Sequence, residues 1–240
     1  MNLLSNSIGL GLLEGSGFSM KEIFASATIF NKFLMVFLVL LLLYQIYYVI
    51  ERLVMYGQSN TASEKFLKLF MDTLRRGDFE ASKRAATTHN KSHIALVLKH
   101  GLDIFQYEKQ LKLTNSNHDV IQPVERAIER GTAEVTELLK KGMATLATIA
   151  SLSPFIGLLG TVIGIIAVFA DLKAKGAGDI NALAGSIGEA LVTTALGLAV
   201  AIPAAWFYNI LTNKQDQTIM NINNAASQMI DEFIRRESQA

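Results

Sequence analysis

Residues 144–211 decide the fold, and they read ATLATIASLSPFIGLLGTVIGIIAVFA, then DLKAKGAGDINALAG, then SIGEALVTTALGLAVAIPAAWFYNIL. The first and third segments are apolar, and each exceeds the ~20 residues that cross a ~30 Å hydrocarbon core. The middle segment is too short for a domain, so we expect an antiparallel pair of membrane-spanning helices. The second helix holds one carboxylate, Glu189. A charged group at that depth costs about 2.5–3.5 kcal/mol on insertion scales, so it rarely lacks a function.

Composition places the chain among membrane proteins. Half of its 240 residues are apolar and the formal net charge is +1, which argues against disorder and against a nucleic-acid partner. The absence of cysteine excludes disulfides and thiolate metal sites. A third apolar run, residues 33–50, ends in tyrosines followed by Glu51 and Arg52, as at a water interface. We interpret it as a lipid-facing span; a buried helix of a soluble protein is disfavoured because no polar stripe interrupts 33–44.

The remaining sequence predicts long helices that leave the bilayer on one side. Residues 57–142 are polar, and short amphipathic stretches within them indicate a small helical subdomain. From Pro123 onward, apolar residues recur at spacings of three, four and seven with no breaker stronger than glycine, so one helix is expected over 123–170. A second stripe follows Tyr208 to the C-terminus. These stripes need partners, and self-association into a ring would cover them.

We therefore predict an all-α membrane protein with three transmembrane helices, two of them long and extended into the cytoplasm, and a small helical cytoplasmic subdomain. Lys and Arg are concentrated in residues 51–143, so the positive-inside rule places the N-terminus and the outer turn outside. The expected segments are an N-terminal periplasmic or interfacial segment at 1–26, TM helix 1 at 27–52, the cytoplasmic subdomain at 53–122, a long helix with TM helix 2 at 123–170, a periplasmic turn at 171–180, and a long helix with TM helix 3 at 181–236.

Polar groups are expected to meet at one depth of this hairpin. Thr161 and Glu189 are equally far from the middle of the turn, near residue 175, so they reach nearly the same depth. Thr193 lies one helical turn after Glu189 and shares its face, whereas Thr194 lies further round. The expected lining residues of an ion pathway are Thr161, Glu189, Thr194, Thr193, Thr148 and Ser153, the last two continuing the polar track toward the inner side.

This pattern suits ion movement for a physical reason. A carboxyl group in a low-dielectric environment favours its neutral form, so it can take up and release a proton. Hydroxyls both donate and accept, so they can hold water or relay a proton. A ring of helices with these groups inward would form a hydrated path, driven by about 2.3 kcal/mol per charge per 100 mV. The alternative is that Glu189 and the threonines only hydrogen-bond the helices to one another.

Small residues predict close helix packing in lipid. Glycines at spacings of three and four let helix backbones approach, and proline removes a backbone donor and can kink a helix. Packing within one hairpin and packing between subunits remain equally open from the sequence. The expected packing residues are Gly157, Gly160, Gly164, Gly188, Gly197 and Pro203.

Two long motifs carry a family resemblance. The segments SPFIGLLGTVIGI and GEALVTTALGLAVAIPAAWFYN resemble the proton-channel family that includes TolQ, ExbB and the flagellar stator protein MotA. The unbroken run KKGMATLATIASLSPFIGLLGTVIGI is most similar to the ExbB/TolQ branch. The resemblance covers residues 126–209, and the first span only by its layout.

The resemblance implies a pentamer in the bacterial inner (cytoplasmic) membrane, around a dimer of an ExbD/TolR-like single-span protein, working with a TonB/TolA-like protein. Proton flow would energise transport or envelope work, and no cofactor is implied. By position, the family's pore threonines are Thr161 and Thr194, and its intramembrane glutamate is Glu189. Thr193 stands where many relatives have alanine, which leaves sodium open as the ion.

Other signals favour neither a metal site nor an enzyme. His89 and His93 stand four residues apart, but no carboxylate lies in register with them. No phosphate-binding loop or nucleophile–base pair is present. Two other functions remain open: a non-conducting membrane scaffold for the partner, and a gliding or flagellar-type stator subunit.

Overall fold

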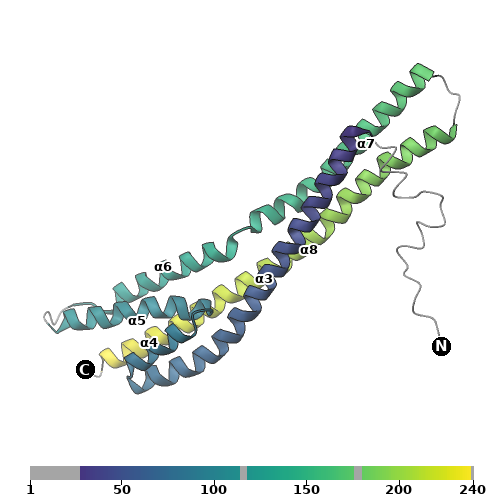
Figure 1. Cartoon of the computed structure of the whole chain (residues 1–240). Helices are drawn as coiled ribbons and strands as arrows, with labels where there is room; N and C mark the ends of the chain where they lie inside the picture. Colours follow the sequence, from purple (N-terminus) through teal and green to yellow (C-terminus); the bar gives the residue numbers. More distant parts are fainter. Residues whose placement is uncertain (1–27, 114–117, 176–179, 239–240) are drawn as a thin grey trace, which may run out of the picture. The chain divides into compact units, whose positions relative to one another are not determined.

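The computed structural model describes residues 28–113, 118–175 and 180–238, and the described residues form helices without any strand (Figure 1). An all-helical chain was predicted, and this class is confirmed. The expected segment 1–26 lies outside the described residues, as do residues 176–179 of the expected outer turn. The helices are α3 (Ile29–Arg76), α4 (Phe79–Thr88), α5 (His93–Lys112), α6 (Ile121–Lys140), α7 (Met143–Lys175) and α8 (Ile180–Glu237).

The chain divides into two compact units, which are described separately. Unit 1 comprises the residues up to Tyr47 together with Thr145–Phe207, and unit 2 comprises Tyr48–Ala144 together with Tyr208–Ala240. Helices α3 and α8 contribute to both units. Within the described residues, three helical stretches are long and apolar enough to cross a membrane, and they begin at Ile29, Ile121 and Gly185. This agrees with the three predicted spans.

Unit 1 is a three-helix bundle in which α7 and α8 approach backbone to backbone. A Cβ atom added to Gly157 would lie 3.0 Å from the Thr194 Cα, and one added to Gly197 would lie 2.6 Å from the Ser153 carbonyl oxygen. The first part of α3 packs on this pair and buries Leu34, Met35 and Leu38. Helix α8 continues as one helix through Pro203.

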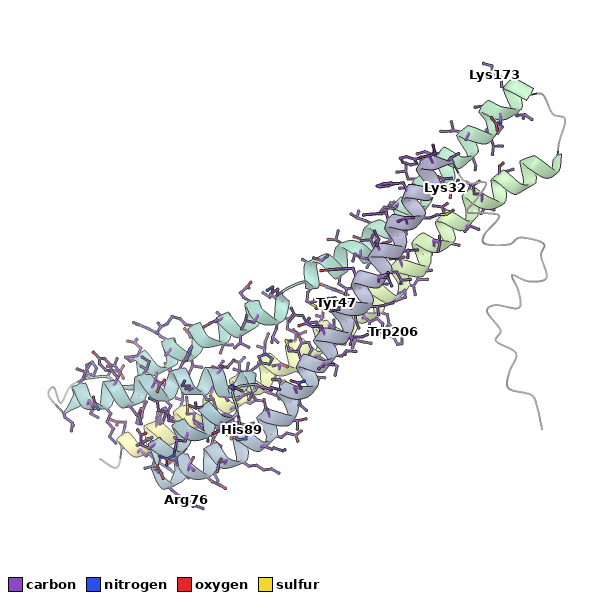
Figure 2. The ribbon with its side chains drawn as sticks, in the orientation of Figure 1. Lys32, Tyr47, Arg76, His89, Lys173 and Trp206 are labelled. Carbon is purple, nitrogen blue, oxygen red and sulfur yellow. The ribbon has the colours of Figure 1, made fainter. Side chains whose placement is uncertain are left out.

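The outer surface of unit 1 carries large apolar side chains. Phe33 and Phe155 are each 65% exposed, which is unfavourable in water and favourable against lipid chains. Tyr47 and Trp206 are also exposed and project from the bundle (Figure 2). Aromatic rings with a polar group are enriched where a bilayer meets water. The surface of unit 1 is therefore that of a membrane-embedded bundle.

Unit 2 has the core of a water-soluble helical domain. Its rings Phe66, Phe70, Phe105 and Phe233 are fully buried, and Phe105 stacks on Phe233 with ring centroids 3.7 Å apart. Short helices α4 and α5 begin at side-chain caps: Asp78 accepts from Ala81 N–H, and Ser92 accepts from Ala95 N–H. Such caps satisfy backbone donors that have no partner within the helix.

Helix α3 is longer than expected. The sequence suggested that the first span and a following amphipathic helix were separate, but α3 runs without interruption through Gly57 to Arg76. A glycine inside a helix costs only about 1 kcal/mol relative to alanine, so packing on both sides of Gly57 is enough to keep the helix continuous. Gly77 ends the helix, with a φ of +80° that favours glycine.

The prediction of a single helix over 123–170 is wrong, because the structure divides this segment at Lys141 and Gly142. Gly142 has a φ of +83°, which ends α6 before α7 begins. Tyr48 and Arg52 of α3 hold this break: the Tyr48 hydroxyl donates to the Lys141 carbonyl at 2.8 Å, and the Arg52 guanidinium donates to the Leu138 and Lys141 carbonyls. These bonds satisfy carbonyls that a continuous helix would have paired internally.

Candidate functional site

Two threonines bridge α7 and α8 in the middle of unit 1. The Thr161 and Thr194 hydroxyls are hydrogen-bonded to each other. Each also lies 3.1 Å from a carbonyl on the opposite helix, Thr161 Oγ1 from Ala190 O and Thr194 Oγ1 from Gly157 O. Both side chains are half-buried. The antiparallel register expected from the sequence is therefore observed, with Thr161 beside the residue that follows Glu189.

Glu189 lies on the other flank of α8, against α3. Its side chain is buried, at 5% exposure, and its Oε1 accepts a hydrogen bond of 3.3 Å from the Asn31 side-chain N–H. Thr193, one turn further along α8, is fully buried, and its Oγ1 lies 3.5 Å from the Glu189 carbonyl. The shared face of Glu189 and Thr193 was predicted, and it is turned toward α3 rather than toward an opening.

The predicted polar residues thus form two groups rather than one track. The threonine pair, Thr161 and Thr194, is partly accessible, whereas the buried carboxyl cluster consists of Asn31, Glu189 and Thr193. Both groups lie at the same level of the α7–α8 pair. The Glu189 carboxyl group therefore lies close along the bundle axis to the half-buried hydroxyls of Thr161 and Thr194.

The two remaining lining candidates lie apart from these groups. Ser153 is fully buried against α8, and its Oγ has no hydrogen-bond partner among the described residues. Thr148 is exposed, and its carbonyl accepts from Ser151 Oγ. Because one is buried and the other exposed, Ser153 and Thr148 do not lie on one continuous face.

The small residues make room for these contacts. A Cβ on Gly160 would overlap the Thr193 side chain and come within 3.3 Å of Leu34 Cδ1. A Cβ on Gly164 would lie 2.8 Å from the Ala190 Cβ and 3.1 Å from the Asn31 Nδ2. Gly188 is partly buried. The packing of Gly157, Gly160, Gly164 and Gly197 is therefore accounted for within one chain.

Sequence reasoning missed the two buried amides of α3. Asn31 is fully buried, and Gln45 is 2% exposed with its Nε2 donating to the Val200 carbonyl at 3.2 Å. The available signal was an amide at either end of an apolar run, since polar side chains in a span usually face protein rather than lipid. The composition of this span had suggested lipid contact on all sides. The two buried amides show that one side faces protein instead.

Glu189 has no acidic competitor in its surroundings. Among residues 29–43, 143–170 and 185–207 the sequence holds one carboxyl group, Glu189, and one basic group, Lys32. Lys32 is half-buried in the first turn of α3, next to Asn31 (Figure 2). Unit 1 therefore offers a single carboxyl position for a proton within these segments.

The histidines belong to unit 2 and serve its packing. His93 Nδ1 lies 2.6 Å from the Ser59 hydroxyl, and burial together with the nearby Arg52 charge lowers the pKa of His93. His89 Nδ1 lies 2.9 Å from the Ala85 carbonyl. Among the described residues, no group of three His, Cys, Asp or Glu side chains is placed to hold a metal ion.

Comparison with known proteins places this arrangement in a family. Residues 89–224, more than half of the chain, match the model of the MotA/TolQ/ExbB proton channel family. The chain belongs to that family. The match to the MotA/TolQ/ExbB family includes every candidate site residue of α7 and α8, whereas Asn31 and the first part of α3 lie outside the matched range.

Several curated relatives carry the name biopolymer transport protein ExbB. The chain is 39% identical over 110 residues to the one from Xanthomonas campestris pv. campestris (strain B100), covering 46% of this chain and 44% of the relative. It is 48% identical over 84 residues to the one from Neisseria gonorrhoeae, covering 35% and 38%. It is 34% identical over 130 residues to the one from Salmonella typhimurium (strain LT2), covering 53% of each. The chain thus spans about half or less of the length of these relatives.

Proposed function

We propose that this chain is the ring-forming motor subunit of an ExbB/TolQ-like complex in the bacterial inner membrane. Five copies would surround a dimer of a single-span ExbD/TolR-like protein. Proton flow through the ring would energise a TonB/TolA-like partner for transport or envelope work. The relatives named biopolymer transport protein ExbB support this assignment over a flagellar-type stator.

One observation carries the proposal: a buried carboxyl group and a half-exposed pair of hydroxyls lie at one level of an apolar bundle. Polar groups at mid-membrane are costly and are retained where an ion or a charged partner group passes. The threonine pair offers hydroxyls to a charged group entering from outside the protomer. Glu189 holds or releases one proton beside it.

This assignment also predicts on which side of the membrane the other segments lie. Residues 53–122 form a cytoplasmic helical subdomain, and the N-terminus and the 171–180 turn lie in the periplasm. Basic residues close to the spanning ends favour this orientation under the positive-inside rule, namely Arg52, Lys140, Lys141 and Lys214.

The test is complementation of a deletion strain together with proton flux in liposomes that contain the complex. We expect Glu189→Gln and Thr161→Val to assemble in normal amounts and to abolish coupled transport, because each removes a group that exchanges or contacts the proton. The matched control is Thr148→Val, which removes an exposed hydroxyl outside the two groups. Full activity in both site variants would refute the motor.

Flux measurements also separate the remaining alternatives. A scaffold that only holds its partner would give no flux above a partner-free control. Repeating the measurement in sodium-free buffer distinguishes the ion, since a proton pathway keeps its flux there and a sodium pathway loses it.

A further inference from the structure

Asn31 occupies a defined position in the first turn of α3. Thr28 caps this helix, its Oγ1 accepting from the Asn31 backbone N–H at 3.3 Å. The cap fixes the start of the helix and therefore the direction in which the Asn31 side chain leaves it. That side chain is fully buried where α3, α7 and α8 converge. Gly164 leaves the space that its amide occupies, since a Cβ there would lie 3.1 Å from Asn31 Nδ2.

The Asn31 amide is satisfied on one side only. Its Nδ2 donates to Glu189 Oε1 at 3.3 Å, while its Oδ1 is buried without a hydrogen-bond partner among the described residues. A buried acceptor left unpaired costs about 1–3 kcal/mol, so native structures rarely keep one without a reason. The Glu189 carboxyl group can supply the missing donor once it carries a proton.

Amide and carboxyl chemistry match in both protonation states. An ionised carboxylate only accepts, so it takes the Asn31 N–H as its partner. A protonated carboxyl also donates, and its O–H can then satisfy Asn31 Oδ1 while its other oxygen keeps the N–H. The same pair of side chains thus forms one hydrogen bond before proton uptake and two after it.

We propose that Asn31 is a positioning residue that holds the Glu189 carboxyl group in place through both its ionised and its protonated state. This inference rests on the proposed function, because it describes how the proton site of that function keeps its geometry while the proton exchanges. Asn31 lies outside residues 89–224, which match the family model.

Few charges face this pair. On α3 the neighbouring ionisable group is Lys32, half-buried at the next residue. On α7, residues 143–170 contain no ionisable side chain and Asp171 follows them, and on α8, residues 185–207 contain only Glu189 itself. Within these apolar segments Glu189 is thus the one acid.

Helix α3 supplies a matched control. Gln45 is a second buried amide on the same helix, it also has one unpartnered oxygen, and it donates to the Val200 carbonyl rather than to an acid. Asn31→Leu and Gln45→Leu therefore remove the same kind of group from the same bundle. Only the first removes a partner of Glu189.

The experiment is infrared spectroscopy of the purified full chain in lipid nanodiscs at low pH. The carboxyl band of Glu189 is assigned by its absence in Glu189→Gln. In Asn31→Leu we expect the C=O stretch of the protonated Glu189 carboxyl group to move to higher wavenumber than in the parent chain, because its carbonyl oxygen has lost the N–H donor and its O–H has lost the amide acceptor. Gln45→Leu should leave this band where it lies in the parent chain.

A second variant guards against misfolding of the first. Asn31→Asp keeps the shape of the side chain and replaces the N–H donor with an acceptor. This variant also lacks the amide N–H, so the band assigned to Glu189 should again differ from that of the parent chain. An unchanged Glu189 band in both Asn31 variants, or an equal band shift in Gln45→Leu, would overturn the positioning role.

Proton flux through the assembled complex then separates the two proposals. If Glu189→Gln keeps full coupled transport, the motor fails whatever the infrared band shows. If Glu189→Gln abolishes transport while Asn31→Leu keeps the band position and the flux of the parent chain, the motor stands and Asn31 has no positioning role. With both proposals correct, Asn31→Leu shifts the Glu189 band and lowers flux about tenfold, as expected for a lost hydrogen bond to an ionisable group.

Discussion

Units 1 and 2 share helices α3 and α8, yet different forces hold them together. Unit 2 buries its aromatic rings and uses helix caps and arginine contacts, as a domain in water does. Unit 1 exposes its aromatic rings and is held by glycine contacts and by hydroxyl and amide bonds between helices. In lipid there is no hydrophobic force between helices, so close backbone approach and buried polar contacts take its place. A single helix can thus be stabilised by buried rings in one part of its length and by close backbone and polar contacts in another.

The largest effect on the free energy of unfolding is expected from removing aromatic rings. Phe105→Ala in unit 2 removes a fully buried ring stacked on Phe233 and should lower the free energy of unfolding by about 3–5 kcal/mol. Phe155→Ala in unit 1 removes a ring that is 65% exposed and should change it by about 0.5 kcal/mol or less. Denaturant unfolding in detergent micelles measures both. Similar losses would show that unit 1 also depends on a ring core.

The effect of a glycine-to-alanine substitution on stability should have opposite signs in the two units. Gly197→Ala places a methyl group 2.6 Å from the Ser153 carbonyl oxygen, which is backbone and cannot move aside, so we expect a loss of about 1–3 kcal/mol. Gly57→Ala on the unit 2 part of α3 meets no atom within 4 Å and should stabilise the helix by about 0.5–1 kcal/mol. Thermal unfolding of the two variants beside the parent chain provides the measurement. Tolerance of Gly197→Ala would contradict the backbone contact.

Arg236 tests the capping contacts of unit 2. Its guanidinium donates to the Leu74 and Arg75 carbonyls at the end of α3 and pairs with Glu232. Arg236→Ala should cost about 1–2 kcal/mol and increase hydrogen exchange in the last turn of α3. Arg235→Ala is the control, because that side chain is 58% exposed and donates to Glu232 rather than to the carbonyls at the end of α3. Equal exchange in both variants would remove the capping role.

The smallest effect concerns pH and unit 2 alone. Because the pKa of His93 is lowered by burial and by Arg52, the folded state keeps this ring neutral while the unfolded chain binds a proton. Its contribution to stability is complete above about pH 6.5 and is lost as the pH falls below that value. We expect the opening free energy of α5 amides, obtained from exchange rates corrected for the intrinsic pH dependence of exchange, to be lower at pH 5.5 than at pH 7.5, and His93→Asn to reduce this difference. His100→Asn, at an exposed position, should leave it unchanged.

Much of unit 1 could be predicted because its constraints are local. The length of the apolar runs indicates the spans. Counting from the turn places Thr161 at nearly the depth of Glu189, and in the structure Thr161 lies against the next residue, Ala190. The facing of Thr193 with Glu189 follows from helix geometry, since residues four apart share a face. These inferences need only the helix repeat and the thickness of a bilayer.

The contacts that the sequence did not reveal join residues far apart in the chain. Asn31 meets Glu189 across 158 positions, and no periodicity within either helix indicates that pairing. The break at Gly142 likewise depends on Tyr48 and Arg52. A glycine within a helical pattern is compatible with continuation, as at Gly57, or with an ending, as at Gly142. Only the neighbouring elements decide between them.

The presence of a single acid in the apolar segments of unit 1 has a stoichiometric consequence. Each copy of the chain can store at most one proton there, so the proposed ring would advance in discrete events, one per copy. At 100 mV each event releases about 2.3 kcal/mol, roughly four times the thermal energy at room temperature. Work that needs more than this, such as pulling a folded segment out of a partner, would require several copies to discharge in succession.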